Sequence, residues 1–245
     1  MKQTLAQDIA KFKMPRVAFV YEWVIHPVFL RFFSGFYKFR TIYRRLLSIS
    51  ENPGYPKDSR VQILDLACGT FWFGRHRLED LLAQGSHPLV SGVDISDNLI
   101  SSARQIMEKT DHPETSWQLL TGDAQATGFP ANHFDEIWLC GALHQIPNQQ
   151  KTIQEVVRML KPGGVFFCQT FLESQSSLWH GIQKRMGESG FQFLNREATK
   201  ALLAQNELTQ IGWTESGLVG LFAYVKSHGG TKHSKPQNKV RNHEK

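Results

Sequence analysis

The stretch Val61-Gln62-Ile63-Leu64-Asp65-Leu66-Ala67-Cys68-Gly69-Thr70-Phe71-Trp72-Phe73-Gly74 decides how this 245-residue chain is interpreted. Its first six residues form a short apolar run, which predicts a buried β-strand. Gly69 then indicates a tight turn before a helix. Three aromatic residues follow, where a phosphate-binding loop would be expected to continue with glycine. The stretch therefore predicts a strand, a turn and a helix, and it raises the question of which ligand the turn can hold.

Apolar runs and helical segments alternate after this stretch, which predicts an α/β fold whose mostly parallel sheet carries helices on both faces. Further strands are expected at residues 89–94, 117–120, 134–140 and 165–170. Helices are expected at about 73–84, 97–109, 148–160 and 197–207, the third ended by Lys161-Pro162-Gly163-Gly164. Residues 208–213 and 218–226 predict an antiparallel hairpin that closes the sheet.

The two ends of the chain are basic and the middle is acidic. Residues 1–50 carry nine Lys/Arg and two Asp/Glu (+7), and residues 226–245 carry six and one (+5), so a net charge of +6 leaves −6 between them. One interpretation is two solvated ends. The other is attraction of the N-terminal face to an anionic membrane surface or an acidic partner.

The first 50 residues also hold 11 of the 28 aromatic residues, and those at 29–37 recur at helical spacing. We therefore predict an aromatic, basic N-terminal helical cap at 1–57, a main domain at 58–228 and a disordered basic tail at 229–245. The apolar run Val17–Leu30 is interrupted by polar residues and proline and is too short to span a bilayer. We expect a cytoplasmic protein, with peripheral membrane contact through the N-terminal segment as an alternative.

Cys68, Cys140 and Cys168 lie far apart and show no paired or ligand-like spacing. A disulfide framework or zinc site is therefore not expected, and we predict no metal.

Polar side chains follow successive predicted strands: Asp65, Asp94, Asp123 and Cys140. In such sheets ligands bind outside the carboxyl ends of the strands, so three carboxylates should surround one crevice. Carboxylates would repel a pyrophosphate, whereas they suit a ligand with an ammonium group and ribose hydroxyls. Asp94 is placed to accept hydrogen bonds from two ribose hydroxyls.

Five motifs, taken in order, resemble the class I (Rossmann-like) methyltransferases that use S-adenosylmethionine, within the methyltransferase type 11 group that includes ubiquinone/menaquinone methyltransferases. They are Ile63–Thr70, Gly92–Ser96, Gly122–Ala124, Phe134–His144 and Arg158–Gly164. The resemblance covers roughly residues 58–172. It implies a doubly wound, mostly parallel seven-stranded sheet with a C-terminal antiparallel hairpin.

The resemblance also implies roles for individual residues of the site. Asp65, Ala67, Cys68 and Gly69 would line the methionine part of S-adenosylmethionine. Asp94 would bind the ribose, Ile95 the adenine face, Asp123 and Ala124 the adenine edge, and Cys140 would lie near the sulfonium. His144 follows the fourth strand and is the candidate general base, with packing or cofactor contact as the alternative.

Phe71 departs from the family pattern, which usually has glycine there. A side chain at positive φ costs about 1–2 kcal/mol, so we expect the loop to be rebuilt with negative φ at Phe71 and Gly74 to provide the close helix–strand approach. The aromatic residues then pack under the helix or wall the methionine site, and the turn still holds S-adenosylmethionine. Weakened cofactor binding and a changed cofactor preference remain open.

The predicted function is methyl transfer from S-adenosylmethionine to a small hydrophobic acceptor such as a quinone, a prenylated aromatic or a lipid. The segment after the fifth strand supports this through Phe171, Leu172, Leu178, Trp179 and Phe191, with ordinary core packing as the alternative for its aromatic residues. The alternatives are a catalytically silent binding or scaffold protein and an RNA methyltransferase. Nucleic acid is not the expected partner, because Leu139-Cys140-Gly141-Ala142 stands where nucleic-acid amino-methyltransferases carry Asn/Asp-Pro-Pro-aromatic. A nicotinamide oxidoreductase ranks last, because Gly-x-Gly-x-x-Gly is absent.

Overall fold

A computed structural model describes residues 33–34, 38–50, 54–188 and 192–228. The predicted tail and most of the predicted N-terminal cap, including Val17–Leu30, lie outside these residues. The domain boundaries at 57 and 228 stay predictions. Along the described parts of the chain, no helix has both the length and the apolar character needed to cross a bilayer.

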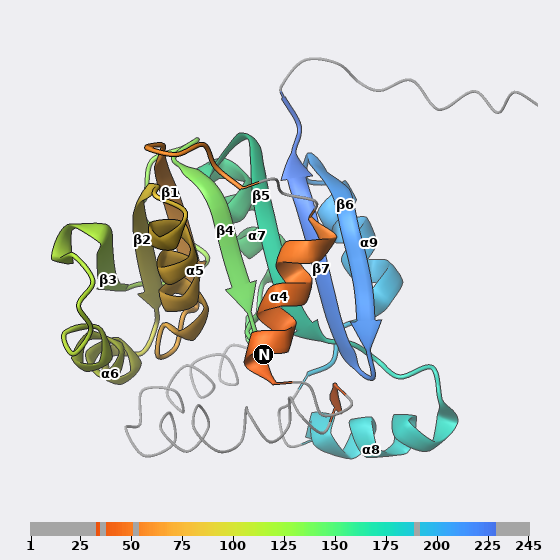
Figure 1. The fold of residues 1–245 in the computed structure, drawn as a ribbon. Coiled ribbons are helices and arrows are strands. Elements are labelled where there is room, and N and C mark those ends of the chain that lie inside the picture. The colour runs from red at the N-terminus through yellow and green to blue at the C-terminus, as the bar shows by residue number, and fades with distance from the viewer. Residues whose placement is uncertain (1–32, 35–37, 51–53, 189–191, 229–245) are drawn as a thin grey trace, which may run out of the picture.

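Seven strands form one sheet in the order β3-β2-β1-β4-β5-β7-β6 (Figure 1). They are β1 (Arg60–Leu66), β2 (His87–Asp94), β3 (Trp117–Thr121), β4 (Phe134–Cys140), β5 (Leu160–Phe171), β6 (Leu208–Ser216) and β7 (Val219–Lys226). The first five pair in parallel, and β7 pairs antiparallel with β5 and β6. The predicted fold class is confirmed, and the strand order reverses between β1 and β4.

Helices cover both faces of the sheet (Figure 1). They are α4 (Phe39–Ile49), α5 (Trp72–Ala83), α6 (Asp97–Met107), α7 (Gln149–Met159), α8 (Ser177–Glu188) and α9 (Arg196–Ala204), with short 3-10 turns η2 (Glu114–Ser116) and η3 (Leu143–Gln145). One buried cluster joins the sheet to α4, α5 and α6, and a second joins it to α7 and α9.

Two segments differ from the prediction. Lys161 to Gly164 was expected to end the helix, and α7 does end at Met159, but the strand expected from Val165 already begins at Leu160, so these residues belong to β5. A register shift between Phe134 and Glu136 accommodates its glycines, with Gly163 at φ 78°. The helix α8 was not expected, because the weak apolar pattern of its sequence does not distinguish a helix from a loop.

A buried ion pair joins α5 to the middle of the sheet. Arg77 Nε and Nη2 donate to the two carboxylate oxygens of Glu136 at 2.9 and 2.6 Å, and Trp138 Nε1 donates to Glu136 at 2.9 Å. Arg77 is 3% exposed and Glu136 0%. Burial lowers the pKa of Arg77, but the Glu136 carboxylate outweighs burial and the net pKa is raised. The pair fixes α5 on β4.

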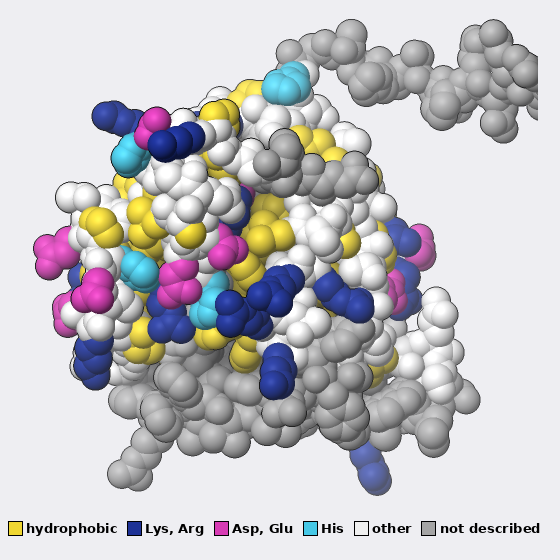
Figure 2. Space-filling model, viewed as in Figure 1, with side chains coloured by type: hydrophobic (Ala, Val, Ile, Leu, Met, Phe, Trp, Pro, Cys, Tyr) yellow, Lys and Arg dark blue, Asp and Glu magenta, His cyan; other side chains and the backbone are white. Residues whose placement is uncertain are grey.

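The helix α4 packs on the same face of the sheet. Tyr43 stacks on Trp138 with ring centroids 5.5 Å apart and donates to Asp80 Oδ2 at 2.6 Å. Burial, followed by the hydrogen bond to Asp80, raises the pKa of Tyr43. The outer side of α4 exposes Arg40 and Arg44, and basic side chains gather over this part of the surface (Figure 2).

Candidate functional site

The candidate site lies at the carboxyl ends of the parallel strands. Asp65 on β1 pairs with Gly92 on one side and with Trp138 on the other. Asp94 lies two residues after Gly92, and Cys140 lies two residues after Trp138. Both side chains are therefore at the same height along the strands and on the same face of the sheet. Cys140 pairs in turn with Gln169 of β5. We call Asp94, Cys140 and Gln169 the strand-end row. With about 4.8 Å between neighbouring strands, it spans roughly 15 Å of the sheet edge.

The turn after β1 is held in a left-handed conformation. Ala67, Gly69 and Phe71 have φ of 55°, 53° and 65°. The backbone N–H of Cys68 donates to the carbonyl oxygen of Val93 at 3.0 Å, so the turn is tied to β2 as well as to its own strand. The N–H of Phe71 donates to the carbonyl oxygen of Cys68 at 2.8 Å and that of Gly69 to Asp94, so these hydrogen bonds fix the shape of the turn.

The expectation for Phe71 was wrong in its backbone conformation: φ is positive, not negative. The ring is fully buried in the cluster under α5. Glycines make room for it: a Cβ on Gly74 would lie 2.1 Å from the ring, and one on Gly92 would lie 2.8 Å from it. Left-handed backbone costs about 1–2 kcal/mol, and burying a phenylalanine contributes about 1.5–3 kcal/mol. Burial of the ring thus offsets the strain.

The two buried carboxylates of the turn bind backbone N–H groups. Asp65 Oδ2 accepts from Gly74 N at 2.8 Å, which satisfies a free N–H in the first turn of α5. Asp94 Oδ2 accepts from Gly69 N and its Oδ1 from Ser96 N, both at 2.9 Å. Burial raises the pKa of Asp94, and hydrogen bonds from the backbone only partly offset this. Each carboxylate oxygen accepts more than one hydrogen bond, so Asp94 keeps capacity for ligand hydroxyls.

The residues predicted for the adenine lie beside the end of β2. Ile95 is half-buried directly after Asp94. Asp123 Oδ1 accepts from the backbone N of Gln125 at 2.9 Å and shapes its own loop, while Ala124 packs partly against the second core cluster. The structure brings these residues to the same edge as Asp94.

Cys140 and His144 lie at the end of β4 in different environments. Cys140 is half-buried, and burial, followed by the nearby Cys168 and Asp65, raises the pKa of its thiol. His144 is fully buried in η3. Its Nδ1 lies 3.3 Å from Thr170 Oγ1, its Nε2 lies 3.3 Å from Gln145 Nε2, and its ring meets Phe171 edge-on at 4.9 Å. The base role of His144 stays a prediction.

Comparison with known proteins gives this geometry a family. Residues 64–168 match the family model described as a methyltransferase domain. A demethylmenaquinone methyltransferase of Listeria welshimeri is 27% identical over 148 residues, covering 59% of this chain and 61% of that protein. The alignment thus spans less than two thirds of that relative's length.

Solved structures agree on the fold. Phosphoethanolamine N-methyltransferase 2 of Haemonchus contortus, in complex with phosphomonomethylethanolamine and S-adenosylhomocysteine, superposes with a TM-score of 0.66 at 16% identity, covering 89% of this chain and 59% of that one. The [4+2]-cyclase SpnF superposes with a TM-score of 0.60 at 16% identity, covering 76% and 81%.

Residues 64–168 therefore resemble a methyltransferase domain, and the solved structures agree with this on the fold. At 16% identity the structural matches show the fold alone, and a cyclase among them indicates that this fold hosts more than one chemistry.

The residues of the methyltransferase domain fit S-adenosylmethionine. The ring of Phe71 is buried in the cluster under α5. Asp94 is ionisable, is tied to the turn through Gly69, and keeps acceptor capacity for ribose hydroxyls. Within the residues that the structure describes, His, Cys, Asp and Glu side chains form no cluster of three or more that could hold a metal ion.

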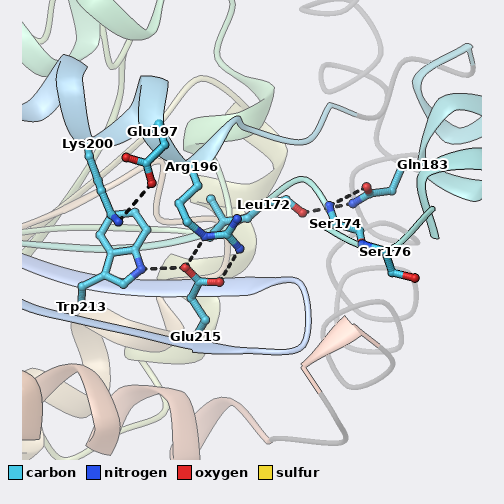
Figure 3. A network of polar contacts seen from close by, with 9 residues as sticks. All are labelled: Leu172, Ser174, Ser176, Gln183, Arg196, Glu197, Lys200, Trp213 and Glu215. Carbon is cyan, nitrogen blue, oxygen red and sulfur yellow. Dashed lines mark hydrogen bonds and ion pairs between the residues drawn. The ribbon is translucent and has the colours of Figure 1, made fainter. Parts of the chain in front are cut away.

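Gln169 and Gln183 were not predicted from the sequence. Gln183 of α8 accepts from Ser174 N at 2.7 Å and donates to the carbonyl oxygen of Leu172 at 3.0 Å, so it anchors α8 at the end of β5 (Figure 3). Nearby, Arg196 pairs with Glu215, which also accepts from Trp213 Nε1 at 2.8 Å. Gln169 could have been noticed as a polar residue within an apolar strand, whereas nothing local distinguishes Gln183.

The acceptor-side aromatic residues are only partly described. Phe171 and Leu172 are buried at the end of β5. Phe171 meets Phe33 edge-on at 5.9 Å, and Phe33 meets Phe193 at 5.9 Å. The side chains of Leu178, Trp179 and Phe191 lie outside the described residues.

Proposed function

We propose that the chain transfers a methyl group from S-adenosylmethionine to a small hydrophobic acceptor with an oxygenated ring. The observation that carries the proposal is the turn between Ala67 and Phe71, locked to Asp94 through Gly69. It holds the carboxylate of the second strand beside the glycine turn, which suits a nucleoside with an amino-acid tail. The family match over residues 64–168 supports the same activity.

Each residue predicted for the cofactor site then has a role. S-adenosylmethionine, when bound, supplies a methyl group activated on a sulfonium, which an acceptor nucleophile takes by in-line displacement. Asp94 would accept from the ribose hydroxyls, and Asp65, Ala67, Cys68 and Gly69 would hold the methionine part. Ile95, Asp123 and Ala124 would border the adenine, with Cys140 near the sulfonium. Positioning and exclusion of water then supply most of the rate enhancement.

His144 would take the proton that the acceptor loses. Thr170 and Gln145 contact its two ring nitrogens and thus fix its orientation beside β4. A base in this position lowers the barrier when the acceptor must deprotonate, an effect typically worth about 10²–10⁴-fold. Replacing His144 by Asn should therefore lower kcat and leave the affinity for S-adenosylhomocysteine unchanged.

A hydrophobic, ring-shaped acceptor is favoured by the aromatic cluster of Phe33, Phe171 and Phe193 at the end of β5. The relative from Listeria welshimeri is named for a demethylmenaquinone, which makes a prenylated naphthoquinol the first acceptor to test. The three cysteines are free, which suits a reducing, cytoplasmic location. The exposed arginines of α4 would favour contact with an anionic membrane surface that holds such an acceptor.

The test begins with isothermal titration of S-adenosylhomocysteine into the wild-type protein and an Asp94→Ala variant. Micromolar binding that is lost in the variant supports the cofactor site. Transfer of a deuterated methyl group to a prenylated naphthohydroquinone is then followed by mass spectrometry. Folded wild-type protein that gives no binding heat would contradict the proposal and favour the silent binding protein.

A further inference from the structure

Gln169 is a buried polar side chain on β5. Its exposed fraction is 0%, and neither its amide nitrogen nor its amide oxygen has a hydrogen-bond partner among the described residues. Buried polar atoms are nearly always satisfied, and leaving one unpaired costs about 1–3 kcal/mol. An amide with both ends unpaired therefore indicates a group from outside the chain that completes it.

The position of Gln169 indicates which molecule supplies the missing hydrogen-bond partner. It occupies the strand-end row beside Cys140, one strand farther from Asp94. Side chains alternate along β5, so Gln169 shares a face with Phe167 and Phe171, both in the cluster on the α4 and α5 side. If the ribose lies at Asp94 and the sulfonium near Cys140, the next position in the row belongs to the acceptor.

The chemistry of the amide narrows the acceptor further. A carboxamide donates two hydrogen bonds and accepts others, so it is complementary to a hydroxyl or a carbonyl oxygen. The surrounding groups are aromatic: Phe171 lies two residues along the strand, and Phe33 packs against it. An aromatic ring that bears oxygen satisfies the amide and the aromatic contacts together.

We propose that Gln169 recognises the acceptor by hydrogen bonding to an oxygen substituent of its ring, an inference that rests on the proposed methyl transfer. The residue selects oxygenated rings over apolar rings of the same shape. A buried polar group that loses its partner rejects analogues more strongly than a hydrophobic contact does.

The experiment compares two probes on protein saturated with S-adenosylhomocysteine. One is a 2-prenylated 1,4-naphthohydroquinone and the other is the 2-prenylated naphthalene without either oxygen. Dissociation constants are measured by quenching of tryptophan fluorescence in the wild type, in Gln169→Met and in Gln62→Met. Gln62 is a matched control, because it lies near the start of β1 and its amide oxygen also lacks a partner among the described residues.

We expect the wild type and Gln62→Met to bind the oxygenated probe at least tenfold more tightly, and Gln169→Met to lose about tenfold of this preference. Free Gln169→Met should also melt about 2–4 °C higher than the wild type, because an unpaired buried amide has been removed. A lower melting temperature would indicate a structural role, for instance with a bound water, and would overturn the inference.

Two further outcomes separate this inference from the proposed function. The role of Gln169 is overturned if the wild type still binds S-adenosylhomocysteine but binds the two probes with equal affinity. It is likewise overturned if the wild type binds S-adenosylhomocysteine and neither probe. Loss of S-adenosylhomocysteine binding from the folded wild-type protein overturns the proposed function itself.

Discussion

Glu136 and Asp94 are both buried carboxylates on strands of one sheet, and they differ in what surrounds them. Glu136 lies in the middle of β4 and meets the guanidinium of Arg77 through two hydrogen bonds. Asp94 lies at the end of β2, where backbone N–H groups of Gly69 and Ser96 bind it. A carboxylate neutralised by a cation stabilises the packing of a helix, whereas one held by N–H groups stays able to bind a ligand. The comparison separates a structural charge from a functional one.

The largest expected effect concerns the structural charge. Glu136→Gln or Arg77→Met should each lower the free energy of unfolding by about 3–5 kcal/mol, because each leaves the opposite charge buried and unpaired. Urea denaturation measures the change. The double variant should lose less than the sum of the two. A single variant that loses less than about 1 kcal/mol would remove the distinction between the two carboxylates.

The next effect concerns the functional charge. Asp94→Asn should weaken S-adenosylhomocysteine binding by about 100-fold, because two hydrogen bonds to a charged acceptor are lost, while the free energy of unfolding changes by at most about 2 kcal/mol. Isothermal titration and urea denaturation on the same preparation test both parts. Unchanged affinity would place the ribose elsewhere.

A smaller effect tests the turn that links the two regions. Gly74→Ala should destabilise the protein by about 1–3 kcal/mol, because the new Cβ would lie 2.1 Å from the ring of Phe71. Combining Gly74→Ala with Phe71→Gly should cost less than the sum of the single changes, since the ring that causes the clash is gone. Thermal unfolding of the four proteins provides the comparison, and strict additivity would argue against this contact.

The smallest effect is the pH dependence that Asp94 introduces. Its pKa is raised above the ordinary 3.8, so S-adenosylhomocysteine affinity should fall by up to about tenfold per pH unit below the raised pKa, as the carboxyl protonates. The contribution to stability has the opposite sign. The folded state binds the proton more tightly, so this contribution declines as pH rises from 3.8 through the raised pKa. S-adenosylhomocysteine affinity and the free energy of unfolding, each measured as a function of pH from 3.8 upward, should show these two dependences in the wild type. The Asp94→Asn variant should show neither.

Much of the fold could be predicted from the sequence, because apolar runs and breaker residues act locally. The runs ending at Leu66, Asp94 and Cys140 became parallel strands, and the predicted hairpin formed between β6 and β7, although β6 extends to Ser216 rather than ending at Trp213. The helix α8 escaped prediction, because its place depends on Gln183 binding the backbone at Leu172 and Ser174.

Some features of the candidate site could likewise be predicted from the sequence, and others could not. Sequence patterns alone predict that Asp65, Asp94, Asp123 and Cys140 follow strands, and parallel strands must bring their carboxyl ends to one edge. Tertiary structure decided the rest, because it depends on contacts between distant residues. The ring of Phe71 lies beside Gly92, Arg77 meets Glu136, and Gln169 is enclosed without a partner among the described residues. Sequence patterns fix which face of a strand a residue occupies, but packing across the sheet decides whether its charge or amide is neutralised or left for a ligand.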